Sequence, residues 1–187
     1  MISVVILGSG NVATHLIDAF LKIDEIELRQ VYTRNIKDLE SFKNNIPTTN
    51  SIEFLKQADV TIISVSDDAI SELSSKIKNS LVVHTSGSVD MSELKNSTNK
   101  GVFYPLQSFS KDKKINFKNI PICLEAEHNK DLNLLKRLAS QLQGNIYHLD
   151  SNQRKRIHIA AVFVNNFTNH MYAIAHNICK KHDVSFD

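Results

Sequence analysis

A glycine-rich turn near the start of the chain constrains the fold more than any other feature. Residues 2–7 form a short, β-branched apolar run, which is typical of a buried strand in a parallel sheet. The run G-S-G-N-V-A follows at residues 8–13, and apolar residues then recur at helical spacing. A glycine turn between a strand and a helix is the context that a dinucleotide-binding fingerprint requires. The sequence therefore predicts a Rossmann unit, in which Gly8 permits the turn and Gly10 lets the backbone approach a pyrophosphate.

Strands and helices alternate along the rest of the chain. Apolar runs at residues 26–33, 60–65, 81–84, 102–104, 120–124 and 145–149 predict strands, and residues 67–77 and 130–142 predict helices. This alternation indicates an α/β fold with a doubly wound, mostly parallel sheet. A long helix is predicted to begin near residue 150. We therefore expect a cofactor-binding domain over residues 1–149 and the start of a helical domain over residues 150–187.

Composition and charge exclude several classes of protein. With 42% hydrophobic and 22% charged residues among 187, the chain is typical of a globular protein. A net charge of +2 does not favour nucleic acid or an anionic membrane as a partner, and no apolar run is long enough to span a bilayer. Cys123 and Cys179 lie far apart without a cluster of metal ligands, so we expect no disulfide, no metal site and a cytoplasmic location.

The end of the second predicted strand bears on the choice of cofactor. An NAD site usually places Asp or Glu here to bind the ribose 2′-hydroxyl, whereas this chain has Thr33, Arg34 and Asn35. An arginine can bind a 2′-phosphate with two hydrogen bonds, so the sequence predicts NADP. The alternative is that Arg34 is a solvated residue at the start of a helix.

Other strand ends supply further candidates, because ligands of such sheets bind beyond the carboxyl ends of the strands. His84, at the end of one predicted strand, is a candidate proton donor to a substrate carbonyl, or else a buried structural histidine that bonds to the backbone. The predicted cofactor-binding residues are Gly8, Ser9, Gly10, Asn11, Val12, Thr33, Arg34, Asn35, Ser64, Val65, Ser66, Thr85 and Ser86.

The final helical segment has no charged residue from 157 to 179. A surface helix carries charge on its outer face, so we expect this helix to be buried on most sides. His158 and Asn165 lie on its polar stripe, as a candidate proton donor and a candidate substrate-orienting residue, or as groups that bond to neighbouring backbone. The wide apolar face predicts a homodimer that forms through this helix. Basic residues 154–156, in its first turn, suit either a solvated surface or an anionic ligand.

Several stretches resemble a known family. They are GSGNVATHL at 8–16, YTRN at 32–35, ISVSDDAI at 63–70, VVHTSGSVDM at 82–91, GVFYPLQSFSK at 101–111, IPICLEA at 120–126 and SNQRKRIHIAAVFVNNFTNHMYAIA at 151–175. The chain is similar to the Rossmann-like NADP-binding proteins that carry the domain of unknown function 2520. These belong to the 6-phosphogluconate dehydrogenase-like superfamily, near pyrroline-5-carboxylate reductase and the deazaflavin-dependent NADP reductases. The resemblance implies an all-helical C-terminal domain that completes the active-site cleft and often forms the dimer.

Two departures from the superfamily pattern bear on function. Its dehydrogenases often place a catalytic lysine one turn before an asparagine on the first long helix. If Asn165 is that asparagine, Ala161 stands at the lysine position and His158 becomes the candidate in its place. The family's helical domain also normally continues beyond this length, so we expect either a truncated product or a helix that docks on another chain.

Two functions follow as alternatives. The first is an NADP-dependent oxidoreductase that moves a hydride between NADPH and a small carbonyl or imine substrate, with His158 or His84 as proton donor. The second is a non-catalytic protein that binds or senses NADP(H), which the missing lysine favours. A methyltransferase is a weaker reading, since the end of the second strand lacks the acidic residue that such enzymes use on a ribose.

Overall fold

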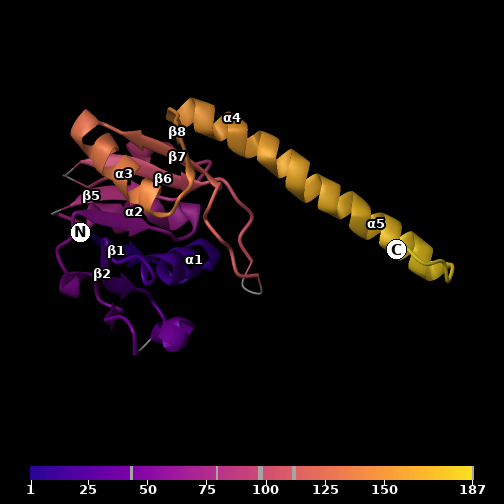
Figure 1. The fold of residues 1–187 in the computed structure, drawn as a ribbon, viewed down its shortest axis with the longest axis horizontal. Helices are drawn as coiled ribbons and strands as arrows, with labels where there is room; N and C mark the ends of the chain where they lie inside the picture. Colours follow the sequence, from indigo (N-terminus) through magenta and orange to yellow (C-terminus); the bar gives the residue numbers. More distant parts are fainter. Residues whose placement is uncertain (43, 79, 97–98, 111–112, 187) are drawn as a thin grey trace.

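The computed structural model describes residues 1–42, 44–78, 80–96, 99–110 and 113–186, and an eight-stranded sheet forms its centre (Figure 1). The strand order is β3-β2-β1-β4-β5-β6-β7-β8, and all neighbouring strands are parallel except β6 and β7. The first six strands have the order of a Rossmann sheet, which confirms the predicted fold class. The strands are β1 (Ile2–Leu7), β2 (Ile26–Tyr32), β3 (Thr48–Thr49), β4 (Val60–Ile63), β5 (Leu81–His84), β6 (Lys100–Pro105), β7 (Pro121–Ala126) and β8 (Asn145–His148).

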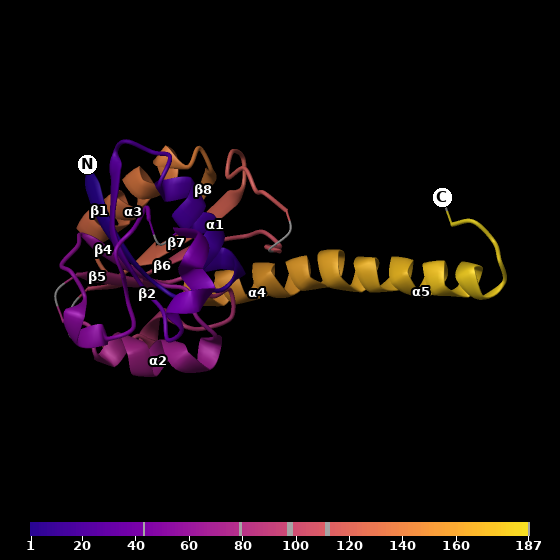
Figure 2. The ribbon, with the colours of Figure 1, turned by 90° about the horizontal axis from the view of Figure 1, so that it is seen from below.

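Helices cover both faces of this sheet (Figure 2). Helices α1 (Asn11–Phe20) and α3 (Asn129–Gln141) pack on one face, in an apolar cluster that contains Val4 and Ile6 of β1. Helix α2 (Asp67–Ser75) packs on the other face, in a second cluster with Val5 and Leu7. Strand β1 is buried along its whole length because its alternate side chains enter these two clusters. Short 3₁₀ segments η1 (Ile36–Phe42), η2 (Ile52–Phe54) and η3 (Met91–Glu93) lie in the connections.

The topology also fixes where a ligand can bind. Strand β1 pairs with β2 on one side and with β4 on the other, so the chain leaves the carboxyl ends of β1 and β4 in opposite directions, toward β2 and toward β5. Such a switch point opens a crevice at the carboxyl edge of a parallel sheet. Helix α1 begins in this crevice, directly after Gly10.

A long helix leaves the sheet after β8. It comprises α4 (Ser151–Val162), a π-helical turn η4 (Phe163–Phe167) and α5 (Thr168–Lys181), and it projects away from the domain in both ribbon views (Figures 1 and 2). A capping box fixes its start: the Asp150 carboxylate accepts from the Gln153 N–H at 2.8 Å, and the Gln153 side chain accepts from the Asp150 N–H at 3.0 Å. The predicted start of this helix is therefore confirmed.

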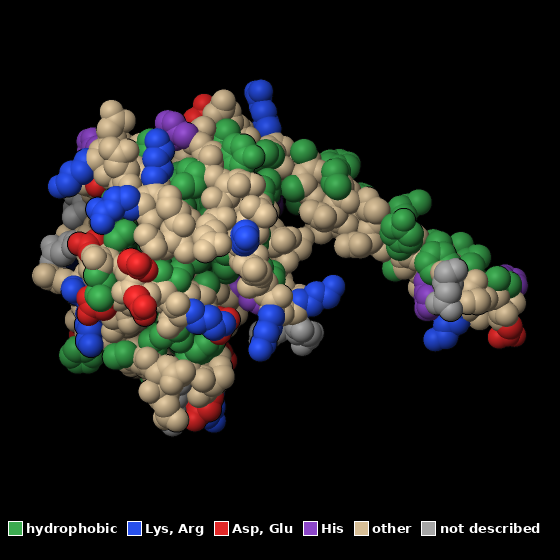
Figure 3. Space-filling view, viewed as in Figure 1, with side chains coloured by type: hydrophobic (Ala, Val, Ile, Leu, Met, Phe, Trp, Pro, Cys, Tyr) green, Lys and Arg blue, Asp and Glu red, His purple; other side chains and the backbone are tan. Residues whose placement is uncertain are grey.

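The expectation that this uncharged helix is buried is wrong for the chain on its own. Phe163, Val164 and Met171 are 59%, 69% and 65% exposed, and green side chains run along the projecting helix in Figure 3. The described part of the chain offers no surface that covers these side chains. No helix within the described ranges has the length and apolarity needed to cross a membrane.

Candidate active site

The two glycines of the turn at the crevice are explained by different structural constraints. Gly8 has a φ of +134°, and a Cβ there would lie 1.9 Å from the Ser64 carbonyl oxygen, so only glycine fits. Gly10 has an ordinary φ of −74°, but a Cβ there would meet nothing within 4 Å. The backbone at Gly10 therefore faces open space. Within the described residues, no side chain caps the start of α1 and its first turn contains no acidic residue. This arrangement suits a phosphate group.

A cavity of about 670 Å³ opens onto this turn. Its walls come from the carboxyl ends of β1, β2, β4 and β5, from the first turn of α1, from α2, and from residues of the connections that include Ile52, Gln107 and Phe109. The structure thus brings together all but one of the residues that the sequence predicts to bind a cofactor. That these residues bind a cofactor stays a prediction. Those that line the cavity are Gly8, Ser9, Gly10, Asn11, Val12, Thr33, Arg34, Ser64, Val65, Ser66, Thr85 and Ser86.

Asn35 is the exception, since it does not line the cavity. Its amide donates to one carboxylate oxygen of Asp38 at 3.0 Å, and the Ser9 hydroxyl donates to the other at 3.1 Å. The Thr33 hydroxyl in turn donates to the Ser9 oxygen at 3.0 Å. Sequence reasoning missed Asp38 because it considered only the strand end. The available signal for this contact was an acidic residue about one turn into the segment that follows the strand.

Arg34 lines the same cavity from the end of β2. No hydrogen bond or ion pair joins its guanidinium to another residue in the described ranges. The cavity therefore contains an unpaired cation near the Ser9–Asp38 contact, and this cation can pair with an anionic ligand. Together with the open backbone at Gly10, it makes the cavity fit the diphosphate of a dinucleotide.

A second cavity of about 130 Å³ lies beside the first. His158 and Asn165 both line it, as does Ala161, which stands at the expected lysine position. Gln107 lines both cavities and so marks where they adjoin. The structure thus places the two helix residues predicted for the substrate next to the predicted cofactor site.

His158 forms a hydrogen bond that sequence reasoning missed. Its Nδ1 atom lies 2.9 Å from the Tyr104 hydroxyl, at the end of β6. Burial raises the pKa of Tyr104 to about 12, and the nearby Cys123 thiol contributes in the same direction. A tyrosine at the carboxyl end of a predicted strand was the only signal for this contact.

Gly87 allows this pair to lie against the loop that follows β5. A Cβ at Gly87 would lie 2.5 Å from His158 Nδ1 and 2.8 Å from Tyr104 Cζ. Atoms do not approach this closely, so any larger residue would displace the His158 ring or the loop. Because Ser86, which precedes Gly87, lines the larger cavity, the loop joins the two halves of the site.

His84 is not brought to either cavity. Its side chain is fully buried, and the Ser86 N–H donates to its Nδ1 at 3.1 Å. Burial lowers the pKa of His84 to about 3, and the Arg154 charge contributes. A neutral histidine packed in the core cannot reach a substrate in these cavities, so its placement favours the structural alternative over proton donation.

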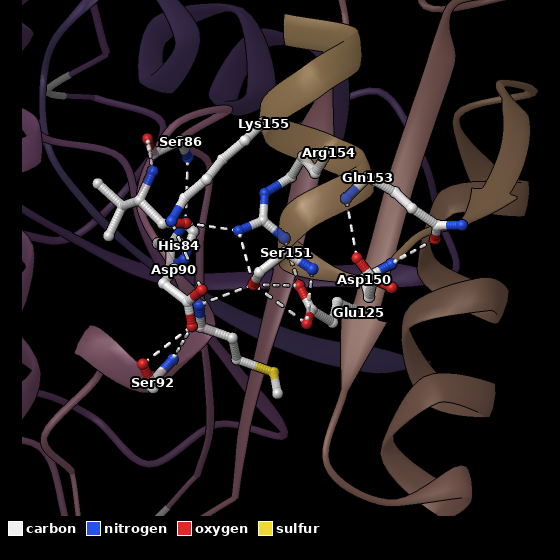
Figure 4. A network of polar contacts seen from close by, with 12 residues as sticks. His84, Ser86, Asp90, Ser92, Glu125, Asp150, Ser151, Gln153, Arg154 and Lys155 are labelled. Carbon is white, nitrogen blue, oxygen red and sulfur yellow. Dashed lines mark hydrogen bonds and ion pairs between the residues drawn. The ribbon is translucent and has the colours of Figure 1, made fainter.

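Arg154 is the largest departure from expectation at the site (Figure 4). It does not face solvent or a ligand: it is fully buried, and its guanidinium forms an ion pair with Glu125 of β7. It also donates to the Val89 carbonyl at 2.5 Å. The Ser151 hydroxyl donates to Glu125 at 2.8 Å and accepts from the Met91 N–H at 3.0 Å. This network holds α4 against β7 and against the loop after β5, one turn before His158.

Comparison with known proteins agrees with this geometry. Residues 3–87 match the family model described as NADP oxidoreductase, coenzyme F420-dependent, and residues 120–187 match the domain of unknown function 2520. A Bacteroides fragilis protein, named as a candidate NADP oxidoreductase, is 37% identical with a TM-score of 0.88; the match covers 100% of this chain and 75% of that protein. No curated protein matches the chain by sequence.

More distant solved structures share the fold. A Thermotoga maritima protein is 20% identical with a TM-score of 0.73, and the match covers 97% of this chain and 71% of that one. A 1-pyrroline-5-carboxylate reductase from Streptococcus pyogenes is 11% identical with a TM-score of 0.73, and the match covers 98% and 72%. The resemblance predicted from sequence is confirmed, and the chain belongs to the family of nicotinamide-cofactor oxidoreductases in which an NADP oxidoreductase domain is combined with the domain of unknown function 2520.

Proposed function

We propose that this protein is an NADP-dependent oxidoreductase that moves a hydride between NADPH and a small carbonyl or imine substrate. The observation that carries the proposal is the pairing of two adjoining cavities. One has an open glycine turn and the unpaired Arg34, and the other is lined by His158 and Asn165. A dinucleotide fits the first cavity, and a small polar molecule fits the second.

Different residues of the larger cavity bind different parts of the cofactor. The free N–H groups at the start of α1 and the exposed backbone at Gly10 receive the diphosphate. Arg34 pairs with the ribose 2′-phosphate, which is the group that distinguishes NADP from NAD. Thr33 and Ser9 offer hydroxyl groups beside it. When bound, the nicotinamide ring supplies the hydride equivalent.

The smaller cavity holds the substrate. In the reductive direction the His158 ring would donate a proton to the substrate oxygen or nitrogen, while the substrate carbon would receive the hydride that a bound NADPH supplies. Asn165 lines the same cavity and orients the substrate through its amide. These residues supply positioning and a proton, which are the protein's share of such a reaction.

A second candidate function is supported by Ala161. The superfamily's lysine position holds a methyl group at the wall of the smaller cavity, which offers no ionisable group there. A protein that binds NADP(H) without turnover, as a sensor, fits this substitution. The presence of His158 at the same wall favours the oxidoreductase.

The exposed helix supports a homodimer as part of the same proposal. Its apolar face includes Phe163 and Phe167, whose rings stack at 4.8 Å between centroids. Both side chains are more than half exposed, and residues 157–179 carry no charge. A second copy of the chain would cover this face and would bring a second wall to the smaller cavity, which opens beside the helix.

The test is NADPH consumption against a panel of small ketones and cyclic imines, together with direct measurement of NADPH and NADH binding. We expect tighter binding of NADPH and turnover with part of the panel. His158→Ala should abolish turnover and keep NADPH affinity, whereas His170→Ala, an exposed histidine on the same helix, should change neither. Equal affinities would refute the NADP assignment. NADPH binding without any turnover would support the sensor.

A further inference from the structure

The geometry of the Tyr104–His158 hydrogen bond bears on which ring nitrogen of His158 carries the proton. The Tyr104 hydroxyl lies 2.9 Å from Nδ1, and the two rings meet edge to face at 76°. Tyr104 is 9% exposed and also lines the smaller cavity. Within the described ranges, His158 is the hydrogen-bond partner of this hydroxyl.

The direction of the hydrogen bond follows from these facts. If Nδ1–H donated to the phenol oxygen, the phenol proton would need another acceptor. Tyr104 lines the smaller cavity, but no described residue there or elsewhere accepts a hydrogen bond from its hydroxyl apart from His158. Burial also keeps the phenol protonated, with a pKa of about 12. Tyr104 therefore donates to Nδ1, and the neutral ring carries its proton on Nε2. Since Tyr104 and Gly87 cover the Nδ1 side, Nε2 is the nitrogen left for the cavity.

We propose that Tyr104 is a positioning residue that acts on the substrate through His158, by holding Nε2–H toward the smaller cavity and by resupplying its proton. This inference rests on the proposed oxidoreductase function. As the hydride reaches the substrate carbon, the Nε2–H bond breaks and an O–H bond forms on the substrate oxygen. The Tyr104 proton moves to Nδ1 at the same time. His158 stays neutral, and the negative charge passes to the phenol oxygen. After the product leaves, Nε2 takes a proton from water in the cavity and the Nδ1 proton returns to the Tyr104 oxygen, which restores the starting tautomer.

The acidities of the groups favour this direction of transfer. The oxygen of a reduced carbonyl, as an alkoxide, is about as basic as hydroxide and therefore a much stronger base than a phenolate. A phenolate at Tyr104 is a weaker base, because the pKa of this phenol is about 12. The charged or titratable groups that face the pair are Cys123 from β7 and Arg154 from α4, the latter with its partner Glu125. The Arg154 cation lowers the cost of the transient phenolate.

The first test reads the tautomer and needs no substrate. Long-range ¹⁵N–¹H NMR of the imidazole rings in the whole protein should show His158 mainly as the Nε2–H tautomer. Tyr104→Phe removes only the hydroxyl and should mix the two tautomers, while Tyr147→Phe, an exposed tyrosine on β8, should leave the spectrum unchanged. An unchanged His158 tautomer in Tyr104→Phe would overturn the proposal, whether or not the protein proves to be a reductase.

The second test uses turnover. Tyr104→Phe should lower kcat at least about tenfold, with the KM for NADPH unchanged, because the relay donates a proton without binding the cofactor. The dependence of kcat on the fraction of D₂O should be curved in the wild type, where two protons move, and linear in Tyr104→Phe. A change in KM alone, or a linear dependence in the wild type, would overturn the relay.

Discussion

Arg154 in the first turn of α4 and Glu125 on β7 form an ion pair in which the guanidinium is fully buried. The pair joins the projecting helix to the sheet across 29 residues of sequence. The Ser151 hydroxyl donates to Glu125, and the Val89 carbonyl accepts from the Arg154 guanidinium, whose Nε has no hydrogen-bond partner among the described residues. Because His158 follows Arg154 by one helical turn, the pair sets the side of α4 that faces Tyr104 and the smaller cavity.

Breaking this ion pair should destabilise the protein strongly. Arg154→Met leaves Glu125 as an unpaired carboxylate, 12% exposed, and removing one partner of a buried pair costs about 3–5 kcal/mol. Arg156→Met is the matched control, since Arg156 is an exposed arginine of the same turn. Urea unfolding measures both. Equal midpoints for the two variants would show that the buried pair does not stabilise the fold.

The same pair shows why part of the site could not be predicted from sequence. Nothing in the basic run at residues 154–156 distinguishes the arginine that is buried from the other two basic residues, which are not. The distinction depends on how α4 docks, and Glu125 lies on a strand whose neighbours only the sheet topology defines. The glycine turn was predictable because its residues are contiguous and its chemistry is local. Tyr104 and His158 were not predictable as a pair, since their contact spans 54 residues.

For the projecting helix, by contrast, the sequence pattern led to a wrong prediction. Its lack of charge predicted burial, and the chain on its own leaves it exposed. The pattern correctly reports an apolar surface, but a single sequence does not say which molecule covers it. His84 illustrates a third case: the end of a strand is polar in sequence, but whether its side chain points into the crevice or into the core is decided by register.

Gly8 and Gly10 should respond differently to the same substitution. Gly8→Ala places a Cβ against the Ser64 carbonyl at a positive φ, so we expect a loss of stability of at least about 1–3 kcal/mol. Gly10→Ala meets no protein atom and should leave stability nearly unchanged, but its methyl group enters the space assigned to the diphosphate. NADPH affinity should then fall at least about tenfold, or 1.4 kcal/mol. Thermal unfolding and titration calorimetry separate the two effects. Wild-type NADPH affinity in Gly10→Ala would contradict this placement of the diphosphate.

Arg34 and Asp38 should shift cofactor preference in opposite directions. Arg34→Ala removes the cation proposed to bind the 2′-phosphate, and a charged hydrogen bond contributes about 1.5–3 kcal/mol, so the preference for NADPH over NADH should fall about 10- to 100-fold. Asp38→Asn removes a carboxylate 3.1 Å from the Ser9 hydroxyl and should raise that preference. Arg29→Ala, whose side chain pairs with Glu27, is the control. The ratio of the two dissociation constants is the measurement, and the prediction fails if Arg34→Ala leaves it unchanged.

The buried His84 should make stability fall in mild acid. An unfolded histidine takes up a proton below about pH 6.5, while burial and the Arg154 charge hold the folded pKa of His84 at about 3. The folded pKa is depressed, so acid favours the unfolded chain. The contribution is complete above pH 6.5 and is lost progressively as the pH falls toward 3. Linkage gives a loss of about 2 kcal/mol between pH 7 and pH 5. His84→Asn, which keeps an acceptor for the Ser86 N–H, should remove this dependence from urea unfolding curves. Substitution of the exposed His128 should preserve it, and a His84→Asn curve as pH-dependent as the wild type would contradict the assignment.

The apolar helix should make association depend on a few exposed side chains. Phe167 is 54% exposed and stacks on Phe163, so Phe167→Glu puts a charge in the centre of the face proposed to meet a second copy. We expect the wild type to be dimeric by light scattering and to bind an apolar dye only on dilution, whereas Phe167→Glu should be monomeric at concentrations where the wild type is a dimer. Asn169→Glu introduces the same charge on the polar stripe of the helix and should leave the dimer intact. A wild type that stays monomeric and dye-silent at all concentrations would show that another surface, or another molecule, covers this helix.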